Sequence, residues 1–396
     1  MKPKLAVVKG HYFSIEELSL YRPLLSEFDV RFFVSAKDNM SNKRDVPLLK
    51  APCIDSIFNP ISFGLFGKLH GIAGNLAGID PEIVFGLKSK LRGFDVVHTV
   101  DYDYLLTYHL SRLKRKLGFK LVTIHWENIP FARDRQPIAR YFKYKTYEGI
   151  DGFFATSERA KASLVLEGID ESRIFMTGYG IDTGRFKPDK EAGKVWRGRY
   201  NLSDSDRVIL FIGRVRTSKG IFELLYATKK LVTDPEIDSK RIKLVIAGRG
   251  PGEKDVLKMV HRLGLQENVL RIGYIPHDEI HNLHSMADVF CLPSLPRKYW
   301  QEQLGLVFLE AMASGKPVVS TYSGSIPEVV GDAGILVQPN DHLSLFNGLK
   351  RVLADSDLRE SLSRKGLERV LSQFSVEAAS SRLLKAYNEV LSFDGG

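Results

Sequence analysis

Residues 302–319 read EQLGLVFLEAMASGKPVV and are almost entirely apolar or small from the third residue to the lysine. One carboxylate, Glu310, stands in the middle of this run, and a second, Glu302, stands eight positions earlier. The pattern predicts a buried helix over 304–314, closed by Gly315 and a proline just beyond it. A buried acid is costly unless something pairs with it, so Glu310 needs a partner.

The sequence around this stretch alternates between short buried strands and amphipathic helices. Such alternation is typical of an α/β fold with a parallel, doubly wound sheet. The first half of the chain follows the same pattern less regularly. In the second half, strands are predicted at 207–213, 242–248, 269–275 and 289–293, with helical periodicity between them.

A chain of 396 residues is too long for one hydrophobic core and suits two domains. A polar stretch at 185–205 marks the boundary, which gives a first domain at 1–185 and a second at 186–375. The amphipathic C-terminal helix, about 375–396, could pack back on the first domain. Two Rossmann-like domains would face each other across a ligand cleft at the carboxyl ends of their strands.

The composition, with 44% apolar and 26% charged residues, is that of a folded protein. No apolar run reaches the roughly 18 to 20 residues that a membrane span needs. The N-terminus reads as a first strand and not as a signal peptide. Cys53 and Cys291 lie far apart, which argues against a disulfide framework or a cysteine metal site. We therefore expect a cytoplasmic protein.

The net charge is +10, and two basic runs at 112–120 and 133–145 stand out. Basic patches attract nucleic acid, anionic membranes or anionic ligands, although a solvated helix face is an equally good interpretation. The chain has no recognisable nucleic-acid-binding module, so we expect no nucleic-acid partner. A peripheral contact of 112–145 with the inner face of an anionic membrane is the alternative hypothesis.

The loop that follows the strand 207–213 has the sequence GRVRTSKG. Gly213 and the glycine that ends the loop would let the backbone approach a ligand closely. Arg214 and Lys219 place two cations at the carboxyl edge of a strand, where ligands bind in open α/β sheets. Two cations there suit a diphosphate, and an ordinary surface loop is the alternative.

If the step from Glu302 to Glu310 is helical, it spans roughly 12 Å and leaves the two side chains about 80° apart. The two acids then cannot share one metal ion, but they could hold two ends of an elongated ligand. Gly305 would leave backbone N–H groups, those of Leu306 and Val307, open to an anion. A nucleoside diphosphate sugar matches this order of acid, anion site and acid, because it has sugar hydroxyls, a diphosphate and a ribose diol. The alternative is that Glu310 contacts a structural arginine or water.

These residues resemble the Glu–seven residues–Glu signature of the retaining glycosyltransferases of family four, which have the GT-B fold. Further stretches fit that family in order: GIDTGRFKP (180–188), FIGRVRTSKG (211–220), VIAGRGPGE (245–253), ADVFCLPS (287–294), SGSIPEVV (323–330) and FSVEAA (374–379). The similarity is strong over 150–396 and weak before it. It implies that the second domain binds a nucleotide sugar and that the first holds the acceptor.

The family's pattern also implies roles for single residues. Glu310 would bind the ribose, and Glu302 the transferred sugar. Arg214 and Lys219 would hold the diphosphate and stabilise the leaving group. Three further residues are implied on the donor side: His125 in TIHWENIP lining the sugar site, Ile275 near the base through its backbone, and Gly10 in VVKGHYFS, where the family often has two glycines.

The implied reaction is a retaining transfer of a hexose from a nucleotide-diphosphate sugar to a glycan or lipid-linked acceptor, without a metal ion or other cofactor. A sugar-nucleotide epimerase on the same fold is the alternative enzyme. The sequence departs from the family at Tyr179, where an asparagine is usual, and at Ser325, where a glycine is usual. These departures leave the acceptor open.

Two patterns resemble metal sites, and we predict no metal site from either. The Asp-x-Asp at 101–103 has counterparts at 204–206 and 355–357, so the pattern carries little information. His277 and the histidines four and seven residues later share one helical face that could bind zinc. A solvated histidine face is the interpretation that we favour.

Overall fold

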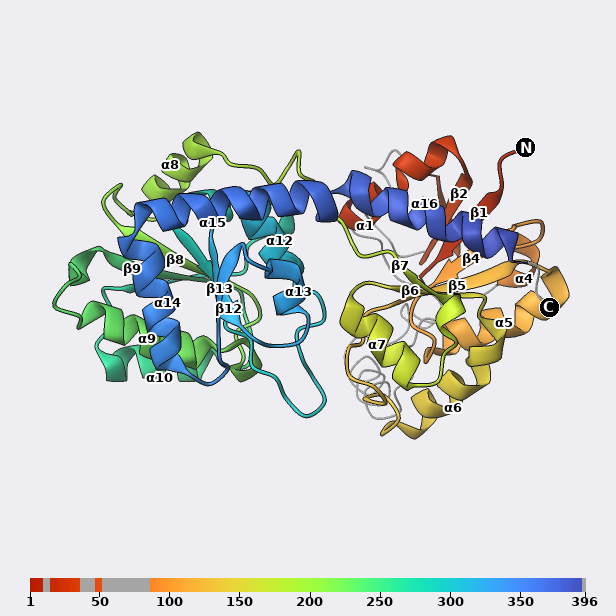
Figure 1. Cartoon of the computed structure of the whole chain (residues 1–396), viewed down its shortest axis with the longest axis horizontal. Coiled ribbons are helices and arrows are strands. Elements are labelled where there is room, and N and C mark those ends of the chain that lie inside the picture. Colours follow the sequence, from red (N-terminus) through yellow and green to blue (C-terminus); the bar gives the residue numbers. More distant parts are fainter. Residues whose placement is uncertain (10–14, 36–46, 52–85, 394–396) are drawn as a thin grey trace, which may run out of the picture. The chain divides into compact units, whose positions relative to one another are not determined.

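Two parallel sheets organise the chain (Figure 1). The computed structural model describes residues 1–9, 15–35, 47–51 and 86–393, so Gly10 lies outside the described residues. The chain divides into two compact units, one formed by Met1–Gly180 with the C-terminal segment from Val376, the other by Ile181–Ser375. The division between them falls five residues before the expected position at 185.

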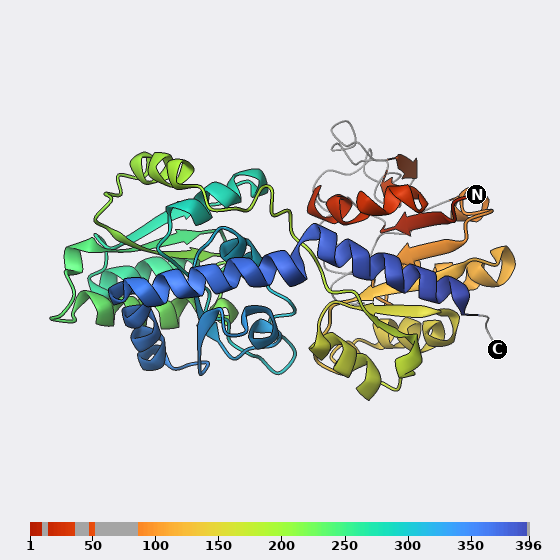
Figure 2. The ribbon, with the colours of Figure 1, turned by 45° about the horizontal axis from the view of Figure 1, so that its top comes forward.

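The first unit holds a seven-stranded sheet with the order β3-β2-β1-β4-β5-β6-β7. Its strands are β1 Lys4–Val8, β2 Asp29–Ser35, β3 Leu48–Ala51, β4 Val96–Thr99, β5 Lys120–His125, β6 Gly152–Ala155 and β7 Ile174–Met176. Its α-helices are α1 Ile15–Tyr21, α4 Leu87–Lys90, α5 Leu105–Leu117, α6 Pro137–Thr146, α7 Glu158–Leu166 and α16 Val376–Ser392. Helix α16 packs against α1 and β7, so the chain returns to the first unit at its C-terminal end (Figure 2).

The second unit holds a six-stranded sheet with the order β10-β9-β8-β11-β12-β13. Its strands are β8 Arg207–Ile212, β9 Ile242–Ala247, β10 Val269–Gly273, β11 Val289–Cys291, β12 Val318–Thr321 and β13 Gly334–Val337. Its α-helices are α8 Lys190–Arg199, α9 Ile221–Val232, α10 Glu253–Leu263, α11 Ile280–Met286, α12 Leu306–Ala313, α13 Ile326–Val330, α14 His342–Ala354 and α15 Ser356–Arg369.

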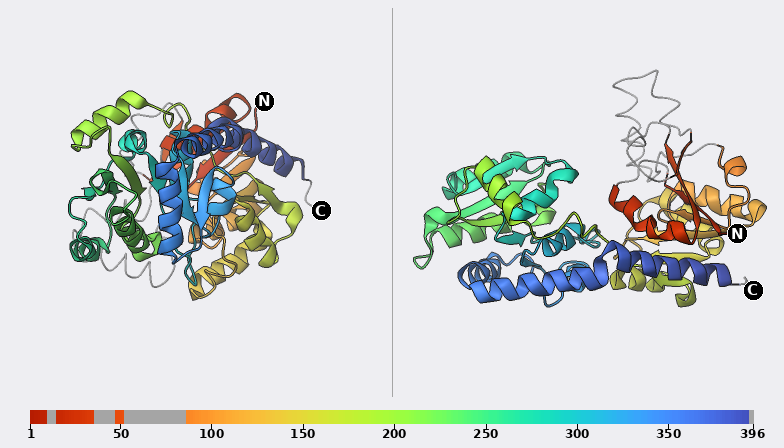
Figure 3. Two further views of the ribbon diagram at one scale, coloured as in Figure 1. Left: turned by 60° about the vertical axis from the view of Figure 1, so that its left-hand side comes forward. Right: turned by 90° about the horizontal axis from the view of Figure 1, so that it is seen from above.

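Helices flank both sheets (Figure 3), so central strands such as β1 and β8 carry continuous buried apolar runs. In β8, the four residues Val208–Phe211 are fully buried, and in β1 burial extends over Leu5–Val8. All strand pairs in both sheets are parallel. Among the helices of the described residues, none is long and apolar enough to cross a membrane.

Each sheet has one point at which the strand order reverses. In the first sheet, β1 lies between β2 and β4, and in the second sheet, β8 lies between β9 and β11. Ligands of open parallel sheets bind at the carboxyl ends of the strands at such a point. The carboxyl ends of β1 and β4 form the first switch point, and those of β8 and β11 form the second switch point.

The helix that carries Glu310 is shorter than its apolar run. It was expected at 304–314, and it begins at Leu306 and ends at Ala313. Gly315 adopts the left-handed conformation expected of a residue that ends a helix, with φ of 68°. At the other end, Gly305 is also left-handed, with φ of 74°, so the chain turns sharply just before the helix.

Candidate active site

The loop after β8 is held beside the end of β9. The backbone N–H of Gly213 donates to the carbonyl of Ala247 at 3.0 Å, and that of Val215 donates to Arg249 at 3.0 Å. The exposed side chain of Arg214 forms no hydrogen bond or ion pair with any residue that the structure describes. Backbone contacts fix the loop and leave this guanidinium available to a ligand.

Gly220, at the end of that loop, is required by packing. It has φ of 68°, and a Cβ there would lie 1.8 Å from the carbonyl oxygen of Pro293. The close approach of a ligand to this glycine stays a prediction. Its neighbour Lys219 is the residue that reaches the site.

Lys219 and Glu302 form a direct ion pair. The Lys219 Nζ lies 3.0 and 2.7 Å from the two carboxylate oxygens, and the hydroxyl of Ser294 donates to the carboxylate at 2.7 Å. The ring of Trp300 lies 5.0 Å from the same Nζ. Glu302 is only 8% exposed, and the Lys219 cation and the Ser294 hydroxyl help to compensate for its burial. The family pattern implied that Lys219 holds the diphosphate and Glu302 the transferred sugar. In the structure the two side chains form an ion pair with each other.

Glu302 does not belong to the helix of Glu310. The segment before Gly305 is not helical, and α12 begins at Leu306. The helical step of roughly 12 Å between the two acids is therefore wrong, although the two carboxylates do occupy different positions. A Cβ on Gly305 would lie 2.5 Å from the Phe308 ring, which explains why this tight turn needs a glycine.

The first turn of α12 presents unused backbone donors. No described residue accepts a hydrogen bond from the N–H of Leu306 or of Val307, while the N–H of Phe308 donates to Gly305 at 2.9 Å. The positive end of the helix dipole adds to the attraction for negative charge. This end of α12 can therefore bind an anion next to the Lys219–Glu302 pair.

The buried acid of α12 is paired with two histidines. Glu310 is 6% exposed, and its carboxylate lies 3.2 Å from His277 Nε2 and 3.6 Å from His284 Nε2. Burial raises the pKa of Glu310, but the two imidazoles more than offset this and lower the pKa to about 2. Glu310 therefore stays ionised, and the partners that the structure gives its carboxylate among the described residues are imidazoles. Ile275 lies two residues before His277.

The histidines at 277, 281 and 284 lie on α11 and on the turn His277–Glu279 before it, and they are not all solvated. His284 is fully buried, and burial lowers its pKa, so it contacts Glu310 as a neutral imidazole. His277, in contrast, is half exposed. The described residues contain no group of three or more His, Cys, Asp or Glu side chains that could hold a metal ion.

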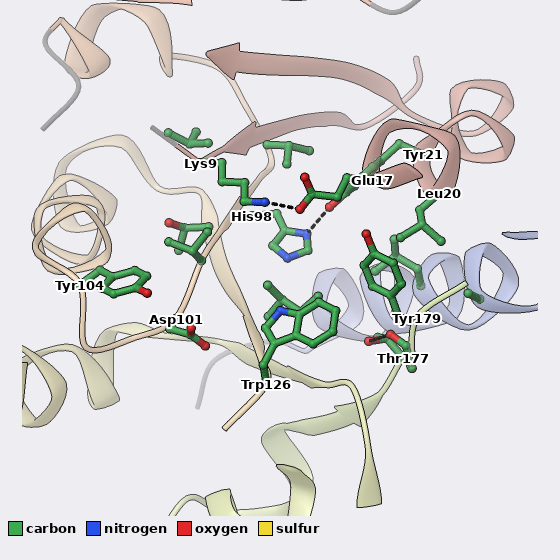
Figure 4. A pocket seen from close by; sticks show the side chains of 18 residues that line it. Lys9, Glu17, Leu20, Tyr21, His98, Asp101, Tyr104, Trp126, Thr177 and Tyr179 are labelled. Atoms are coloured by element: carbon green, nitrogen blue, oxygen red, sulfur yellow. Dashed lines mark hydrogen bonds and ion pairs between the residues drawn. The ribbon is translucent and has the colours of Figure 1, made fainter. Parts of the chain in front are cut away.

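At the first switch point the structure contains a pocket of about 250 Å³ (Figure 4). Its floor is formed by the last residues of β1 and β4, and α1 and α16 contribute to its wall. Aliphatic residues line much of it, and four aromatic side chains join them: Tyr21, Tyr104, Trp126 and Tyr179. Its charged groups are an ion pair between Lys9 and Glu17, together with Asp101.

His125, the last residue of β5, is buried near this pocket. Its ring stacks on Tyr102 with centroids 5.1 Å apart and an interplanar angle of 27°. The Nδ1 atom lies 3.7 Å from a carboxylate oxygen of Asp101, and neither ring nitrogen has a hydrogen-bond partner among the described residues. His125 belongs to the first unit, whereas the other predicted residues that the structure describes belong to the second.

The Asp-x-Asp pattern at 101–103 does not form a pair of neighbouring metal ligands. Asp101 faces His125, while the buried Asp103 forms an ion pair with Arg133. The two carboxylates therefore have different partners.

Several residues of the two switch points could not be found from the sequence. Ser294 and the two histidines beside Glu310 come from separate elements, and no local pattern links them to an acid far along the chain. For the pocket of the first unit, the sequence contains one indication, which is His98 near the end of the apolar strand VVHTV. A polar residue at the carboxyl end of a buried strand is a candidate for ligand binding.

Comparison with known proteins assigns both halves of the chain. Residues 194–369 match the family Glycosyl transferases group 1, and residues 65–185 match Glycosyltransferase Family 4. N-acetyl-alpha-D-glucosaminyl L-malate synthase from Bacillus anthracis is 26% identical over 351 residues, which cover 82% of this chain and 88% of that protein.

A second relative and a solved structure agree with this assignment. GDP-mannose-dependent alpha-(1-6)-phosphatidylinositol monomannoside mannosyltransferase from Mycobacterium tuberculosis is 32% identical over 251 residues, covering 62% of this chain and 64% of that protein. The crystal structure of HepE from Anabaena in complex with UDP shares the fold, with a TM-score of 0.76 at 18% identity over 98% of this chain and all of that one. The chain is therefore a glycosyltransferase of family four, group 1, with the GT-B fold.

Proposed function

We propose that this glycosyltransferase moves a hexose from a nucleotide-diphosphate sugar to a hydroxyl of a glycan or lipid-linked acceptor, with retention at the anomeric carbon and without a metal ion. One observation carries the proposal. The second switch point gathers an ion pair (Lys219 with Glu302), a guanidinium without a partner among the described residues (Arg214) and the unused N–H groups at the start of α12.

The proposed roles follow from charge and hydrogen-bonding capacity. The diphosphate accepts hydrogen bonds from Arg214, Lys219 and the N–H groups of Leu306 and Val307. Glu302 and Glu310 belong to the same unit, and carboxylates accept hydrogen bonds from hydroxyls. Glu302 would therefore hold the hydroxyls of the hexose, and the paired Glu310 the hydroxyls of the ribose. Ile275 would contact the base through its backbone.

In the proposed reaction, the bond between the anomeric carbon and the phosphate oxygen breaks, and a bond from that carbon to the acceptor oxygen forms on the same face. The proton of the acceptor hydroxyl moves to the departing phosphate. Negative charge builds up on that phosphate, so fixed cations and helix N–H groups lower the barrier without rearranging. His125, with two ring nitrogens that lack partners among the described residues, would contact the hexose from the first unit.

The lipid-linked class of acceptor is supported by a surface of the first unit. The α6 face consists of exposed side chains on α6 and the loop before it: Phe131, Arg135, Arg140, Tyr141, Tyr144 and Lys145. Cations attract anionic lipid, and tyrosine side chains favour the headgroup region of a membrane. A mycobacterial relative is named for a phosphatidylinositol monomannoside, which is a lipid.

This surface is smaller than the basic segment 112–145, for which a membrane contact was one of two hypotheses. Lys143 is buried between Asp134 and Glu167, at 2.7 and 2.8 Å. Lys114 forms an ion pair with Asp151 at 2.7 Å, and other side chains of the segment are also engaged within the unit. These lysines stabilise the first unit and are not part of the proposed membrane contact.

The first test is thermal stability in the presence of UDP, GDP and ADP and their glucose, mannose and N-acetylglucosamine conjugates. A ligand at a hundred times its dissociation constant adds roughly 2.7 kcal/mol to the stability. We expect one base to raise the melting temperature of the wild type, and Glu310→Ala to remove that increase. The matched control is Glu360→Ala, an exposed acid on α15.

Transfer is then measured with the stabilising donor, with and without EDTA. Glycosidic product formed only when an acceptor is present, and unchanged by EDTA, supports the proposal. Loss of activity in EDTA would count against a metal-independent reaction. Conversion of the donor to an isomeric sugar nucleotide without any acceptor would instead indicate the epimerase.

A further inference from the structure

We propose that the pocket at the first switch point binds the acceptor as an uncharged polyol and that His98 Nε2 forms a hydrogen bond with an acceptor hydroxyl. This inference rests on the proposed function, because it assigns a chemical class to the acceptor of that reaction. It also names His98 as a residue that determines acceptor specificity.

The position and lining of the pocket support a sugar ring. It lies at the carboxyl ends of β1 and β4, with a volume of about 250 Å³. Trp126, Tyr104 and Tyr179 line it from three different segments (Figure 4). Pockets for small ligands combine such apolar and aromatic walls with a few well-placed polar groups. A polyol ring matches this combination, since it has C–H groups on its faces and hydroxyls at its rim.

One nitrogen of His98 is held by two tyrosines. Its Nδ1 lies 3.1 Å from the hydroxyl of Tyr21, on α1, and also contacts the hydroxyl of Tyr387, on α16. The ring packs edge-on against Phe154, with centroids 5.4 Å apart. Contacts from three elements therefore fix the plane of a side chain that is only 3% exposed.

The other nitrogen of His98 is available to a ligand. Nε2 forms no hydrogen bond with any described residue, and it points toward the side of the pocket that Trp126 lines (Figure 4). His98 lines the pocket, so a hydroxyl placed there can pair with this nitrogen inside a largely apolar, desolvated site.

The neutral state of the imidazole favours a hydroxyl as its partner. Burial, with a smaller contribution from the charge of Lys9, lowers the pKa of His98 to about 3. A neutral imidazole has one donor and one acceptor nitrogen, and the tyrosines can stabilise either tautomer. A hydroxyl donates as well as accepts, so it can pair with Nε2 in both tautomers, whereas a carboxylate or phosphate needs a donor.

The charges of the pocket disfavour an anionic acceptor. Among the described residues that line it, Lys9 is the only cation, and Lys9 is paired with Glu17. The carboxylate of Asp101 adds a further negative charge. The described lining residues therefore carry net negative charge, which disfavours a phosphate or carboxylate on the part of the acceptor inside the pocket.

The experiment compares neutral and anionic probes on the full chain by saturation-transfer NMR. The neutral probes are methyl α-D-glucopyranoside, methyl α-D-mannopyranoside and myo-inositol, and the anionic probes are myo-inositol 1-phosphate and L-malate. We expect at least one neutral probe to bind at least tenfold more tightly than both anionic probes. An anionic probe that binds as tightly as the neutral ones, or more tightly, would overturn the assignment.

The role of His98 is tested with His98→Leu, His98→Gln and the matched control His109→Leu on α5. We expect His98→Leu to raise the KM for the acceptor at least tenfold, with the KM for the donor unchanged, and His98→Gln to recover part of the loss. Equal changes in both KM values, or none, in folded protein would refute the role. If His98→Leu fails to fold, Tyr387→Phe tests the role of His98 instead, because it removes a hydroxyl that contacts His98 Nδ1. We then expect the KM for the acceptor to rise roughly threefold and the KM for the donor to stay the same.

Failure of this inference can be told from failure of the proposed function. Nucleotide binding and transfer to an anionic acceptor would leave the proposed function intact and refute the pocket assignment. Absence of nucleotide binding would refute the proposed function itself.

Discussion

The two switch points have the same topology and opposite chemistry. In each sheet the strand order reverses beside the first strand of the unit, at β1 and at β8. The second switch point presents Lys219, Arg214 and helix N–H groups, which suit a diphosphate. The first presents aromatic rings around a histidine. The same sheet topology therefore offers a ligand position in each unit, and the side chains at each edge favour different ligands in our proposals.

The same contrast appears in the buried titratable groups. Glu310 is surrounded by two imidazoles, which lower its pKa to about 2 and keep it charged. His98 is surrounded by phenols and apolar groups, so burial lowers its pKa to about 3 and keeps it neutral. Burial disfavours the charged form in both places, but only Glu310 has partners that compensate for it. An ionised site and a neutral site result from the same fold.

The largest expected effect is at the cation of the second switch point. We expect Lys219→Met to reduce kcat/KM for transfer by on the order of a hundredfold or more, since it removes a charge next to the leaving phosphate. Binding of neutral polyols to the first unit should not change. The control is Lys258→Met on α10, a lysine whose side chain is 82% exposed. A folded Lys219→Met protein with wild-type turnover would contradict the assignment of the diphosphate to the second switch point.

The second effect concerns the α6 face of the first unit. We expect the double variant Arg140→Glu/Lys145→Glu to weaken binding to phosphatidylserine vesicles by about 2 kcal/mol, since each basic residue contributes about 1 kcal/mol near an anionic surface. Transfer to a water-soluble acceptor should stay the same. The control, Lys254→Glu/Lys258→Glu on α10 of the second unit, should bind vesicles as the wild type does. Equal losses in both variants would show that net charge, and not this surface, is responsible.

The smallest effect is a pH dependence of stability that depends on Glu310. The pKa of Glu310 is lowered from 4.5 to about 2 in the folded state. The charged form therefore stabilises the fold above pH 4.5, and this contribution is lost as the pH falls toward 2. Between pH 5.5 and 3.5, urea unfolding should show wild type losing roughly 1 kcal/mol more than Glu310→Gln. Parallel losses in the two proteins would mean that the histidines do not keep Glu310 charged.

Local features of the second unit could be predicted from the sequence. The alternation of apolar strands and helices predicted its parallel sheet, and the left-handed Gly315 ends α12 as expected. The helix start was wrong because Gly305 interrupts an apolar run that periodicity alone extends toward Glu302. Apolar residues show that a segment is buried, but a left-handed glycine decides where the helix begins.

The contacts that join distant segments could not be predicted. Lys219 and Glu302 are 83 residues apart, and His98 and Tyr387 are 289 residues apart. No short-range periodicity links such positions. The two histidines beside Glu310 were not foreseen as its partners, since the sequence suggested a ribose or, as the alternative, an arginine or water. The proposed roles of Arg214, Ile275 and His125 stay predictions.

The sequence by itself determined the α/β class, the family and the loops that bear charge, because these depend on periodicity and on motifs read along the chain. Only the tertiary structure decided which buried groups are charged and which are neutral. That outcome depends on the groups that folding brings within hydrogen-bond distance, such as two imidazoles at Glu310 and two phenols at His98. Solvation and partners, and not residue type alone, determine the charge of a side chain.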